Sequence, residues 1–214
     1  MGSLSDTERS TQSRTASDPS GSRETTPRCA LCGSTDSRQI HVGVRYAPEV
    51  AVRACAGCDV RFLWPRPTSR DLADYYRSDA YRAQYHGVVS PEYTYRKVVG
   101  EARERVNRLL PLLTPETDVL EVGSGSGAFL ETARPHVRST TGVEPANAHR
   151  AWACQQLGVT TVADLAQLGD QRFEMIGLFH TLEHVPDPVG FLRTLTTYLA
   201  RQGRIAIEVP NVTD

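Results

Sequence analysis

The longest hydrophobic pattern in the chain has the spacing of a helix. Between residues 91 and 113 the apolar positions recur every three or four residues, at Tyr95, Val98, Val99, Ala102, Val106, Leu109, Leu110 and Leu113. This period predicts a helix from about Pro91 to Leu113 with one packed face. Arg103, Glu104 and Arg108 fall on the other face, which we expect to be in water.

After Pro115 short apolar runs alternate with helical patterns. Five runs have the length and composition of strands: Asp118 to Glu121, Thr140 to Glu144, Val159 to Val162, Phe173 to Phe179 and Arg204 to Val209. Helices are expected between them, at about Gly127 to Arg134, Asn147 to Leu157 and Pro188 to Ala200. Gly158 has the position of a helix stop, and Asp187 before Pro188 that of a helix cap. The alternation predicts an α/β fold with a parallel sheet between two layers of helices.

The first 90 residues lack this alternation. Residues 1–28 are polar and offer few apolar contacts, which predicts a disordered tail. Residues 29–65 hold four cysteines among short β-prone stretches, which predicts a small ribbon module. Residues 66–90 form a polar connector that contains Tyr75, Tyr76, Tyr81 and Tyr85. The α/β domain then occupies residues 91–214.

Composition and charge exclude several classes of protein. No stretch approaches the roughly 18 consecutive apolar residues that a membrane span needs, and no apolar run follows a basic amino terminus as in a signal peptide. We therefore expect a cytoplasmic protein without a membrane partner. The formal net charge of -1, without a block of like charges, does not indicate nucleic acid or an anionic membrane.

Four of the five cysteines form two Cys-x-x-Cys pairs: Cys29 with Cys32, and Cys55 with Cys58. Two such pairs of thiolates can close a tetrahedral Zn²⁺ site, with Gly33 and Gly57 permitting tight turns. A redox dithiol needs only one pair and a thioredoxin-like context, which the sequence lacks. Four thiolates leave no position for water, so the zinc is expected to be structural. The fifth cysteine, Cys154, is expected to be a small core residue.

Three alternating glycines occupy one loop of the α/β region. The apolar run from Val119 to Val122 leads into Gly123, Gly125 and Gly127. Glycines at such a turn permit positive φ angles and let a ligand approach the main chain. Glu144 ends the next strand, where a carboxylate can accept hydrogen bonds from both ribose hydroxyls of an adenosine. The alternatives are a tight turn without a ligand and a nicotinamide-dinucleotide site, although the latter loop normally starts its domain.

Three segments together resemble class I S-adenosylmethionine-dependent methyltransferases. Residues 121–127 resemble their first motif, an acidic residue two positions before Gly-x-Gly-x-Gly. Residues 179–188 resemble their fourth-strand segment, and residues 203–211 their fifth strand with its Val-Pro-Asn ending. Dehydrogenases would not show the second and third segments. The resemblance covers residues 91–214 and implies a Rossmann-like doubly wound sheet that binds S-adenosyl-L-methionine (SAM).

The resemblance also implies a role for individual residues in binding SAM. The methionine part of the cofactor would lie against the three glycines, with Glu121 near its ammonium group. Glu144 would hold the ribose. Asp164 would accept a hydrogen bond from the adenine amine and Leu165 would pack on the ring, although Asp164 could equally cap a turn.

Phe179, His180 and His184 follow the fourth predicted strand. By the resemblance, Phe179 and His180 would lie nearest the sulfonium and the methyl acceptor. The sulfonium already makes the methyl carbon electrophilic, so the protein must align a nucleophile and remove a proton where required. His180 and His184 are candidate bases because imidazole ionises near neutral pH, and a packed structural role is the alternative for each. His180, Glu183 and His184 also match a metalloprotease pattern, which we reject because His180 directly follows a strand.

The front half carries a second resemblance. The cysteine ribbon followed by residues 64–68 (Trp-Pro-Arg-Pro-Thr) and 71–76 (Asp-Leu-Ala-Asp-Tyr-Tyr) is similar to the N-terminal part of zinc-ribbon methyltransferases. It is more distantly similar to sugar C-methyltransferases of deoxysugar pathways. By analogy, the connector tyrosines would line the acceptor pocket, and packing of the ribbon on the catalytic domain is the alternative.

The sequence therefore predicts methyl transfer from SAM to a small-molecule acceptor, such as a sugar nucleotide or a secondary-metabolite intermediate. One alternative is an RNA methyltransferase that grips nucleic acid with the ribbon, but residues 29–90 carry only eight Arg against six acidic residues. The other is a non-catalytic scaffold that keeps the cofactor-binding fold. The family fold adds strands after the fifth, so we expect the enzyme to continue past Asp214. The oligomeric state stays open.

Overall fold

A computed structural model describes residues 26–44, 47–66 and 90–210. The chain divides into two compact units, Met1–Thr68 and Ser69–Asp214. The predicted disordered tail and the tyrosine-rich connector lie almost entirely outside the described residues. Within the described ranges, no helix has both the length and the apolar character needed to cross a bilayer.

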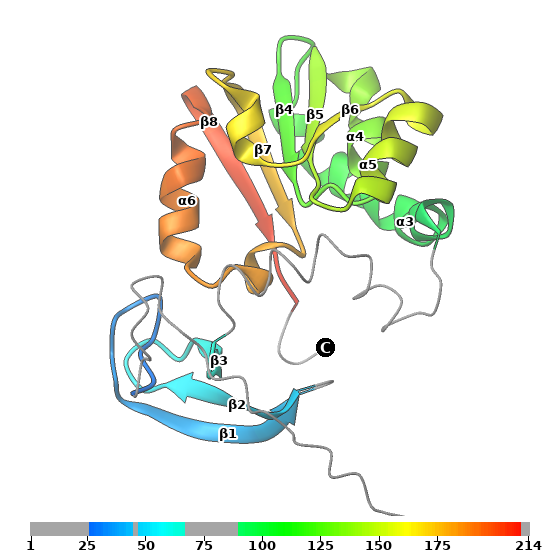
Figure 1. The fold of residues 1–214 in the computed structure, drawn as a ribbon. Helices are drawn as coiled ribbons and strands as arrows, with labels where there is room; N and C mark the ends of the chain where they lie inside the picture. The colour runs from blue at the N-terminus through cyan, green and yellow to red at the C-terminus, as the bar shows by residue number, and fades with distance from the viewer. Residues whose placement is uncertain (1–25, 45–46, 67–89, 211–214) are drawn as a thin grey trace, which may run out of the picture. The chain divides into compact units, whose positions relative to one another are not determined.

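The first unit is a three-stranded antiparallel sheet. Its strands are β1 (Ser37–Val44), β2 (Ala47–Cys55) and β3 (Arg61–Trp64), paired in the order β1-β2-β3 (Figure 1). The two Cys-x-x-Cys turns precede β1 and join β2 to β3. The ribbon expected from the sequence is therefore present as a short meander.

The second unit contains a parallel five-stranded sheet. Its strands are β4 (Asp118–Val122), β5 (Ser139–Val143), β6 (Thr160–Val162), β7 (Phe173–Phe179) and β8 (Leu199–Glu208). The strand order is β6-β5-β4-β7-β8, and all four pairings are parallel. This order reverses direction at β4, the first strand, which confirms the doubly wound Rossmann-like fold.

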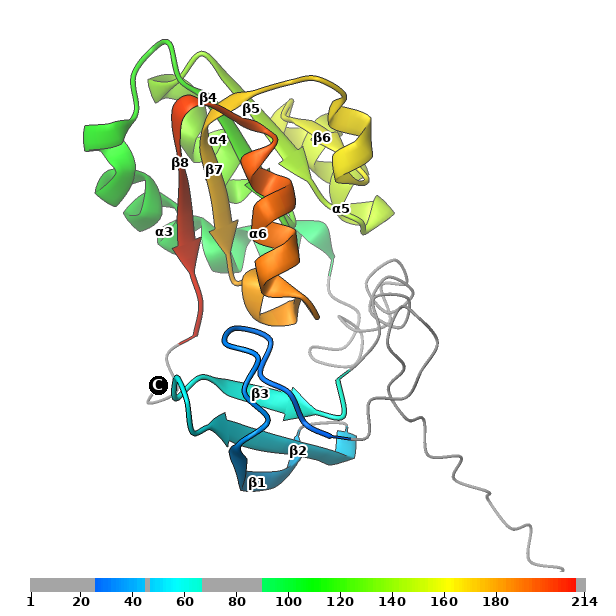
Figure 2. The same ribbon diagram turned by 90° about the vertical axis from the view of Figure 1, so that its left-hand side faces the viewer.

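Helices cover both faces of this sheet. They are α3 (Pro91–Leu109) with η1 (Leu110–Leu112), α4 (Ala128–Ala133) with η2 (Arg134–His136), α5 (Asn147–Trp152) with η3 (Ala153–Leu157), η4 (Leu165–Leu168), η5 (Leu182–His184) and α6 (Pro188–Thr196). Helices α3, α4 and α5 lie on one face and α6 on the other (Figures 1 and 2). As predicted, Asp187 caps α6 by accepting a hydrogen bond from the Gly190 N–H, and Gly158 ends η3 with φ +64°.

Alternate strand residues form two hydrophobic clusters. Val119 of β4 and Met175 of β7 pack with Ala102 and Val106 of α3 and with helix α4. Leu120, Ile176 and Leu178 point to the opposite face and pack with Leu195 of α6. Successive strand residues point to opposite faces, so buried parallel strands read as continuous apolar runs.

Two predicted features of this unit are wrong. Helix α6 ends at Thr196 rather than Ala200, because Leu199 already pairs with Phe173 and β8 continues from there past an irregularity to Glu208. Cys154 is exposed rather than buried, with its Sγ 3.2 Å from Thr161 Oγ1. Ala153, four residues after the buried His149, occupies the buried face of this helix instead.

Candidate functional site

The glycine loop lies at the carboxyl end of β4. Gly123, Gly125 and Gly127 all have left-handed φ angles, of +79°, +52° and +79°. Gly127 is the N-cap of α4, and the Gly127 N–H donates to the Ser124 carbonyl at 2.8 Å. The sequence prediction of a strand that turns through glycines into a helix is confirmed in its geometry.

The three glycines have different surroundings. A Cβ at position 123 would collide with Thr181 Oγ1, and one at position 127 would meet the side chains of Val159 and Ala153 at 3.0 and 3.2 Å. A Cβ at position 125 would have no atom of the described chain within 4 Å. Gly123 and Gly127 thus permit close packing inside the protein. Gly125 borders open space that a ligand could occupy.

Glu144, which follows β5, is fixed beside this loop. Its Oε2 accepts a hydrogen bond from the Gly125 N–H at 2.7 Å, and its Oε1 accepts one from the Ala146 N–H at 2.8 Å. The residue is 4% exposed. The structure therefore brings Gly125 and Glu144 together, and it adds a contact that the sequence did not suggest: the carboxylate supports the loop. Its predicted contact with a ribose stays a prediction.

Glu121 is a buried carboxyl group on β4. Its register neighbours are Gly142 of β5 and Gly177 of β7, neither of which has a side chain to cover it. Burial raises the pKa of Glu121 well above its usual value, with Arg105 acting in the opposite direction. Its Oε2 has no hydrogen-bond partner among the described residues. A buried oxygen of this kind suits a cationic group of a ligand, because an unpaired buried polar atom is costly.

The two residues predicted to contact adenine lie around η4. Asp164 is exposed and caps this helix, since its Oδ1 accepts a hydrogen bond from the Gln167 N–H at 3.2 Å. Leu165 is half-buried and packs against the hydrophobic cluster on the α6 side of the sheet. The capping role that the sequence allowed is therefore present, and the adenine contacts stay predictions.

Phe179 and His180 lie at the carboxyl end of β7. The Phe179 ring packs on Phe129 at 4.6 Å between centroids, and the Arg105 guanidinium lies 5.3 Å from the Phe179 centroid. His180 has a left-handed φ of +52°, and its N–H donates to the Glu208 carbonyl at 2.9 Å. The predicted strand therefore ends directly before His180, so His180 does not lie on a helix as a metalloprotease site of this pattern would need.

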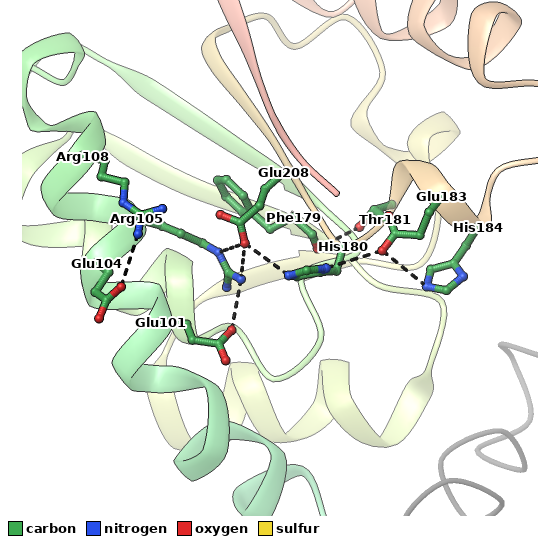
Figure 3. Close-up of polar contacts among 10 residues, drawn as sticks. All are labelled: Glu101, Glu104, Arg105, Arg108, Phe179, His180, Thr181, Glu183, His184 and Glu208. Carbon is green, nitrogen blue, oxygen red and sulfur yellow. Dashed lines mark hydrogen bonds and ion pairs between the residues drawn. The ribbon is translucent and has the colours of Figure 1, made fainter. Parts of the chain in front are cut away.

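His180 belongs to a chain of polar contacts, the His180 cluster, which consists of Arg105, His180, Glu183, His184 and Glu208 (Figure 3). The Glu208 Oε1 lies 3.2 Å from His180 Nε2 and accepts hydrogen bonds from Arg105 Nε and Nη2 at 2.9 and 2.5 Å. The Glu183 Oε1 lies 3.5 Å from His180 Nδ1 and 3.9 Å from His184 Nε2. The structure thus brings both predicted histidines together around one carboxylate.

An open pocket of about 240 Å³ borders this cluster. Its lining residues are Glu101, Glu104, Arg105, Arg108, His180 and Glu208. Both arginines are paired with glutamates, Arg105 with Glu101 and Glu208, and Arg108 with Glu104. The pocket is therefore polar and close to charge balance, which suits a small polar molecule rather than an apolar one.

Comparison with known proteins places this site in a family. Residues 94–214 match the family described as "Methyltransferase domain". The chain belongs to this family. It is 29% identical over 103 residues to the ubiquinone biosynthesis O-methyltransferase of Aeromonas salmonicida, a match that covers 44% of this chain and 43% of that protein. The chain thus spans less than half the length of the curated relative it matches.

One similar solved structure shows the same fold as this methyltransferase domain. Phosphoethanolamine N-methyltransferase 1 of Haemonchus contortus has a TM-score of 0.54 at 13% identity, covering 66% of this chain and 33% of that one. An amino pentose methyltransferase of Micromonospora echinaspora has a TM-score of 0.42 at 23% identity, covering 62% and 56% of the two chains.

Arg105 influences the ionisation of the Glu208 carboxylate in the His180 cluster. The hydrogen bonds from Arg105 hold the pKa of Glu208 below its usual value, so this carboxylate is ionised at neutral pH. Partial desolvation lowers the pKa of His184, against the opposing effect of Glu183. The cluster therefore keeps a fixed negative charge next to His180.

Arg105 and Glu208 are site residues that the sequence did not reveal. They are 103 positions apart in sequence and fit no motif that would join them. Arg105 lies next to residues assigned to the wet face of the predicted helix, yet its side chain is only 11% exposed. Glu208 directly precedes the Val-Pro-Asn ending, within residues 203–211 that carried the family resemblance. The signal available in the sequence was a carboxylate at the end of the fifth predicted strand, which neighbours the strand that ends before His180.

The four cysteines of the first unit converge on one point. Their Sγ atoms all lie within 4.8 Å of one another, with 3.6 Å between Cys29 and Cys58 and 3.4 Å between Cys32 and Cys55. Tetrahedral zinc with Zn–S bonds of about 2.3 Å requires sulfur separations of roughly 3.8 Å. The donor set and its spacing therefore fit a closed zinc site.

The two Cys-x-x-Cys turns have the same backbone pattern. The Gly33 N–H donates to the Cys29 carbonyl at 2.9 Å, and the Asp59 N–H donates to the Cys55 carbonyl at 3.0 Å. Gly33 and Asp59 both have left-handed φ angles. The turn residue in the second pair is thus Asp59 rather than the predicted Gly57. Burial, which acts to raise the pKa of Cys55, is outweighed by the Gly57 N–H and neighbouring groups, which lower it to about 7.

Proposed function

We propose that this chain transfers a methyl group from SAM to a small-molecule acceptor. Membership of the methyltransferase-domain family supports the reaction type. The observation that carries the donor site is Gly125, the glycine of the loop that borders open space and whose N–H is bound by Glu144. The Glu144 carboxylate, the Gly125 main chain and the buried Glu121 lie towards the carboxyl ends of β4 and β5, where this fold binds ligands.

In this proposal each donor-site residue meets one part of SAM. Gly123, Gly125 and Gly127 form the loop under the methionine moiety, Glu121 meets its ammonium group and Glu144 the ribose. Asp164 and Leu165 lie at the adenine, and Phe179 lies nearest the sulfonium. SAM supplies the electrophilic methyl group. The protein contributes alignment, since a well-oriented pair of reactants removes much of the entropic barrier.

The acceptor side of the proposal centres on the two histidines. A nucleophilic atom of the acceptor forms a bond to the methyl carbon, while the carbon–sulfur bond breaks and its electrons pass to sulfur. Where the nucleophile carries a proton, His180 or His184 accepts it. We propose a sugar nucleotide or a secondary-metabolite intermediate as acceptor, because residues 64–76 resemble the front part of sugar methyltransferases. The polar lining of the pocket beside His180 supports a polar acceptor.

Calorimetric titration of the full chain with SAM tests the donor site. Gly125→Ala should abolish or strongly weaken binding, because its Cβ would occupy the space left for the ligand. Gly158→Ala is the matched control, since Gly158 also has a left-handed φ and its Cβ would meet only Arg134 Nη1 at 3.8 Å. Gly158 ends η3 and is not among the residues proposed to bind SAM. Equal SAM affinity in both variants would exclude the proposed donor site.

We further propose that the four cysteines hold one structural Zn²⁺ ion. The closed set of four thiolates supports this, because it leaves no coordination position for a reacting water. Elemental analysis of the purified chain should give about one zinc per chain, and Cys55→Ser should lower this severalfold. Cys154→Ser is the control, because Cys154 lies outside the cluster. A full complement of zinc in the Cys55→Ser variant would contradict the assignment.

A further inference from the structure

Glu208 holds His180 at two points. The Glu208 carbonyl accepts a hydrogen bond from the His180 N–H at 2.9 Å, and its Oε1 lies 3.2 Å from the His180 Nε2. The first contact fixes the backbone of His180 in its left-handed conformation. The second fixes the direction of the ring. A contact from one residue to both main chain and side chain of another leaves the imidazole few orientations.

Arg105 in turn fixes the Glu208 carboxylate. Two guanidinium nitrogens donate to Glu208 Oε1, at 2.9 and 2.5 Å (Figure 3). The Arg105 side chain is itself held, because it lies over the Phe179 ring and pairs with Glu101 at 3.1 Å. Helix α3 therefore supports a carboxylate at the end of β8, and that carboxylate supports a histidine at the end of β7.

The other nitrogen of the ring faces a different carboxylate. Glu183 Oε1 lies 3.5 Å from His180 Nδ1, farther than Glu208 is from Nε2. A neutral imidazole carries one proton, so it can satisfy only one of the two carboxylates. The shorter contact and the anchored geometry favour the proton on Nε2. The titratable and charged groups around the ring are Glu208 of β8, Arg105 and Glu101 of α3, and Glu183 with His184 of η5.

We propose that Glu208 is a positioning residue that keeps the His180 proton on Nε2 and leaves the Nδ1 lone pair to accept a proton from the methyl acceptor. The catalytic part rests on the proposed function. As the acceptor atom bonds to the methyl carbon, its bond to hydrogen breaks and a new bond from hydrogen to Nδ1 forms. The resulting imidazolium has a carboxylate next to each nitrogen, Glu208 at Nε2 and Glu183 at Nδ1. Glu183 thus stabilises the charged ring after the proton has been transferred.

Nitrogen NMR of the full chain with labelled histidine tests the inference without SAM or an acceptor, because the two ring nitrogens give different signals when protonated. The His180 signals are assigned by their loss in His180→Gln. At a pH where the ring is neutral, the wild type should show the Nε2–H form. In Glu208→Ala the share of the Nδ1–H form should rise severalfold, because Glu183 then offers the nearest carboxylate.

Two control variants separate positioning from a general effect on structure. Glu183→Ala removes the carboxylate on the other side of the ring and should leave the Nε2–H form unchanged. Glu101→Ala removes a partner of Arg105 that does not contact the ring, and should also leave it unchanged. Should Glu208→Ala fail to fold, Arg105→Lys provides a milder test, because the loss of the paired donors should raise the Nδ1–H share by a smaller factor.

A wild-type ring with the proton on Nδ1, or the same protonation form in wild type and Glu208→Ala, overturns the proposal. An unchanged share of the Nδ1–H form in a folded Arg105→Lys variant also overturns the proposal. Failure of the proposed function is recognised separately, by the absence of SAM binding in calorimetry. In that case the NMR result would support the contact between Glu208 and His180, and the missing SAM binding would count against its catalytic use.

Discussion

The two units of this chain are stabilised in different ways. Among residues 26–66 that the structure describes, the buried apolar side chains are small: Cys29, Ala51, Ala54 and Cys55. Larger apolar residues of this unit, such as Leu31, Val42 and Leu63, are exposed. The methyltransferase domain instead buries large side chains on both faces of its sheet, including Phe173, Leu120, Met175 and Ile176.

This difference indicates where each unit obtains its folding free energy. Ordering a residue costs about 1–2 kcal/mol of backbone entropy, and a few buried alanines and cysteines cannot offset that for a small sheet. Under the proposed zinc site, the first unit depends on the bonds that its four thiolates make to the metal. The methyltransferase domain depends on burial of apolar surface.

Removal of the proposed zinc ion should have the largest effect. Structural zinc contributes an apparent 10–16 kcal/mol or so in zinc-finger peptides, so chelation should unfold β1, β2 and β3. The methyltransferase domain should keep its structure, since none of its core residues is a ligand. Hydrogen exchange measured by mass spectrometry, before and after chelation, checks this. Loss of protection in β4 and β7 as well would break the contrast between the units.

Truncation of a core residue in the methyltransferase domain should destabilise that domain and leave the first unit intact. Ile176→Ala on β7 should lower the free energy of unfolding of the methyltransferase domain by about 2–5 kcal/mol, because Ile176 is fully buried. Ile207→Ala on the adjacent β8 is the control, with an expected change near 0.5 kcal/mol or less, because Ile207 is 46% exposed. Denaturant unfolding measures both. Zinc content should stay the same in either variant, and a loss of zinc would contradict the independence of the two units.

Loss of a single loop carboxylate should affect binding more than stability. Glu144→Ala should weaken SAM binding by about 1.5–3 kcal/mol, the usual scale for hydrogen bonds to a charged group. Part of the loss comes from the Gly125 N–H, which would lose its acceptor. Glu174→Ala is the matched control, because Glu174 accepts a hydrogen bond from the Asp118 N–H at the opposite edge of the sheet. Calorimetry that finds equal losses in the two variants would argue against a ligand at Glu144.

Lowering the pH should produce the smallest effect on stability, and this effect should arise in the methyltransferase domain. The hydrogen bonds from Arg138 lower the pKa of Asp118. A carboxylate with a lowered folded-state pKa adds stability above its unfolded value of about 3.9, and this is lost as pH falls through the folded value. Asp118→Asn should therefore show a flatter loss of stability below about pH 4 than the wild type. Urea midpoints measured between neutral pH and the acid range compare the two slopes.

The sequence was sufficient for features that depend on local patterns. The period of the apolar residues placed β4, β5 and β7 within a residue or so, and Asp187 and Gly158 marked helix ends by their own backbone preferences. The family motif gave the glycine loop. In each case the signal and its cause lie within a few residues, so no knowledge of the tertiary structure was needed.

Features that depend on distant residues could not be predicted in this way. The different surroundings of Gly123 and Gly125 are set by Thr181 and by open space, neither of which is local. Cys154 is exposed because tertiary packing selects the face of the helix that carries His149 and Ala153. The pairing of Arg105 with Glu208 arises only when α3 packs beside the end of β8.

The contact between Thr181 and the glycine loop has a kinetic consequence. The Thr181 hydroxyl donates to the Val122 carbonyl at 2.9 Å, and its side chain fills the space beside Gly123. The loop after β4 and the segment that begins at His180 therefore share one contact, so ordering of the first by a donor also orders the second. Coupling of this kind is reciprocal, and each ligand should raise the affinity for the other. Under the proposed function, we expect each bound ligand to slow the dissociation of the other.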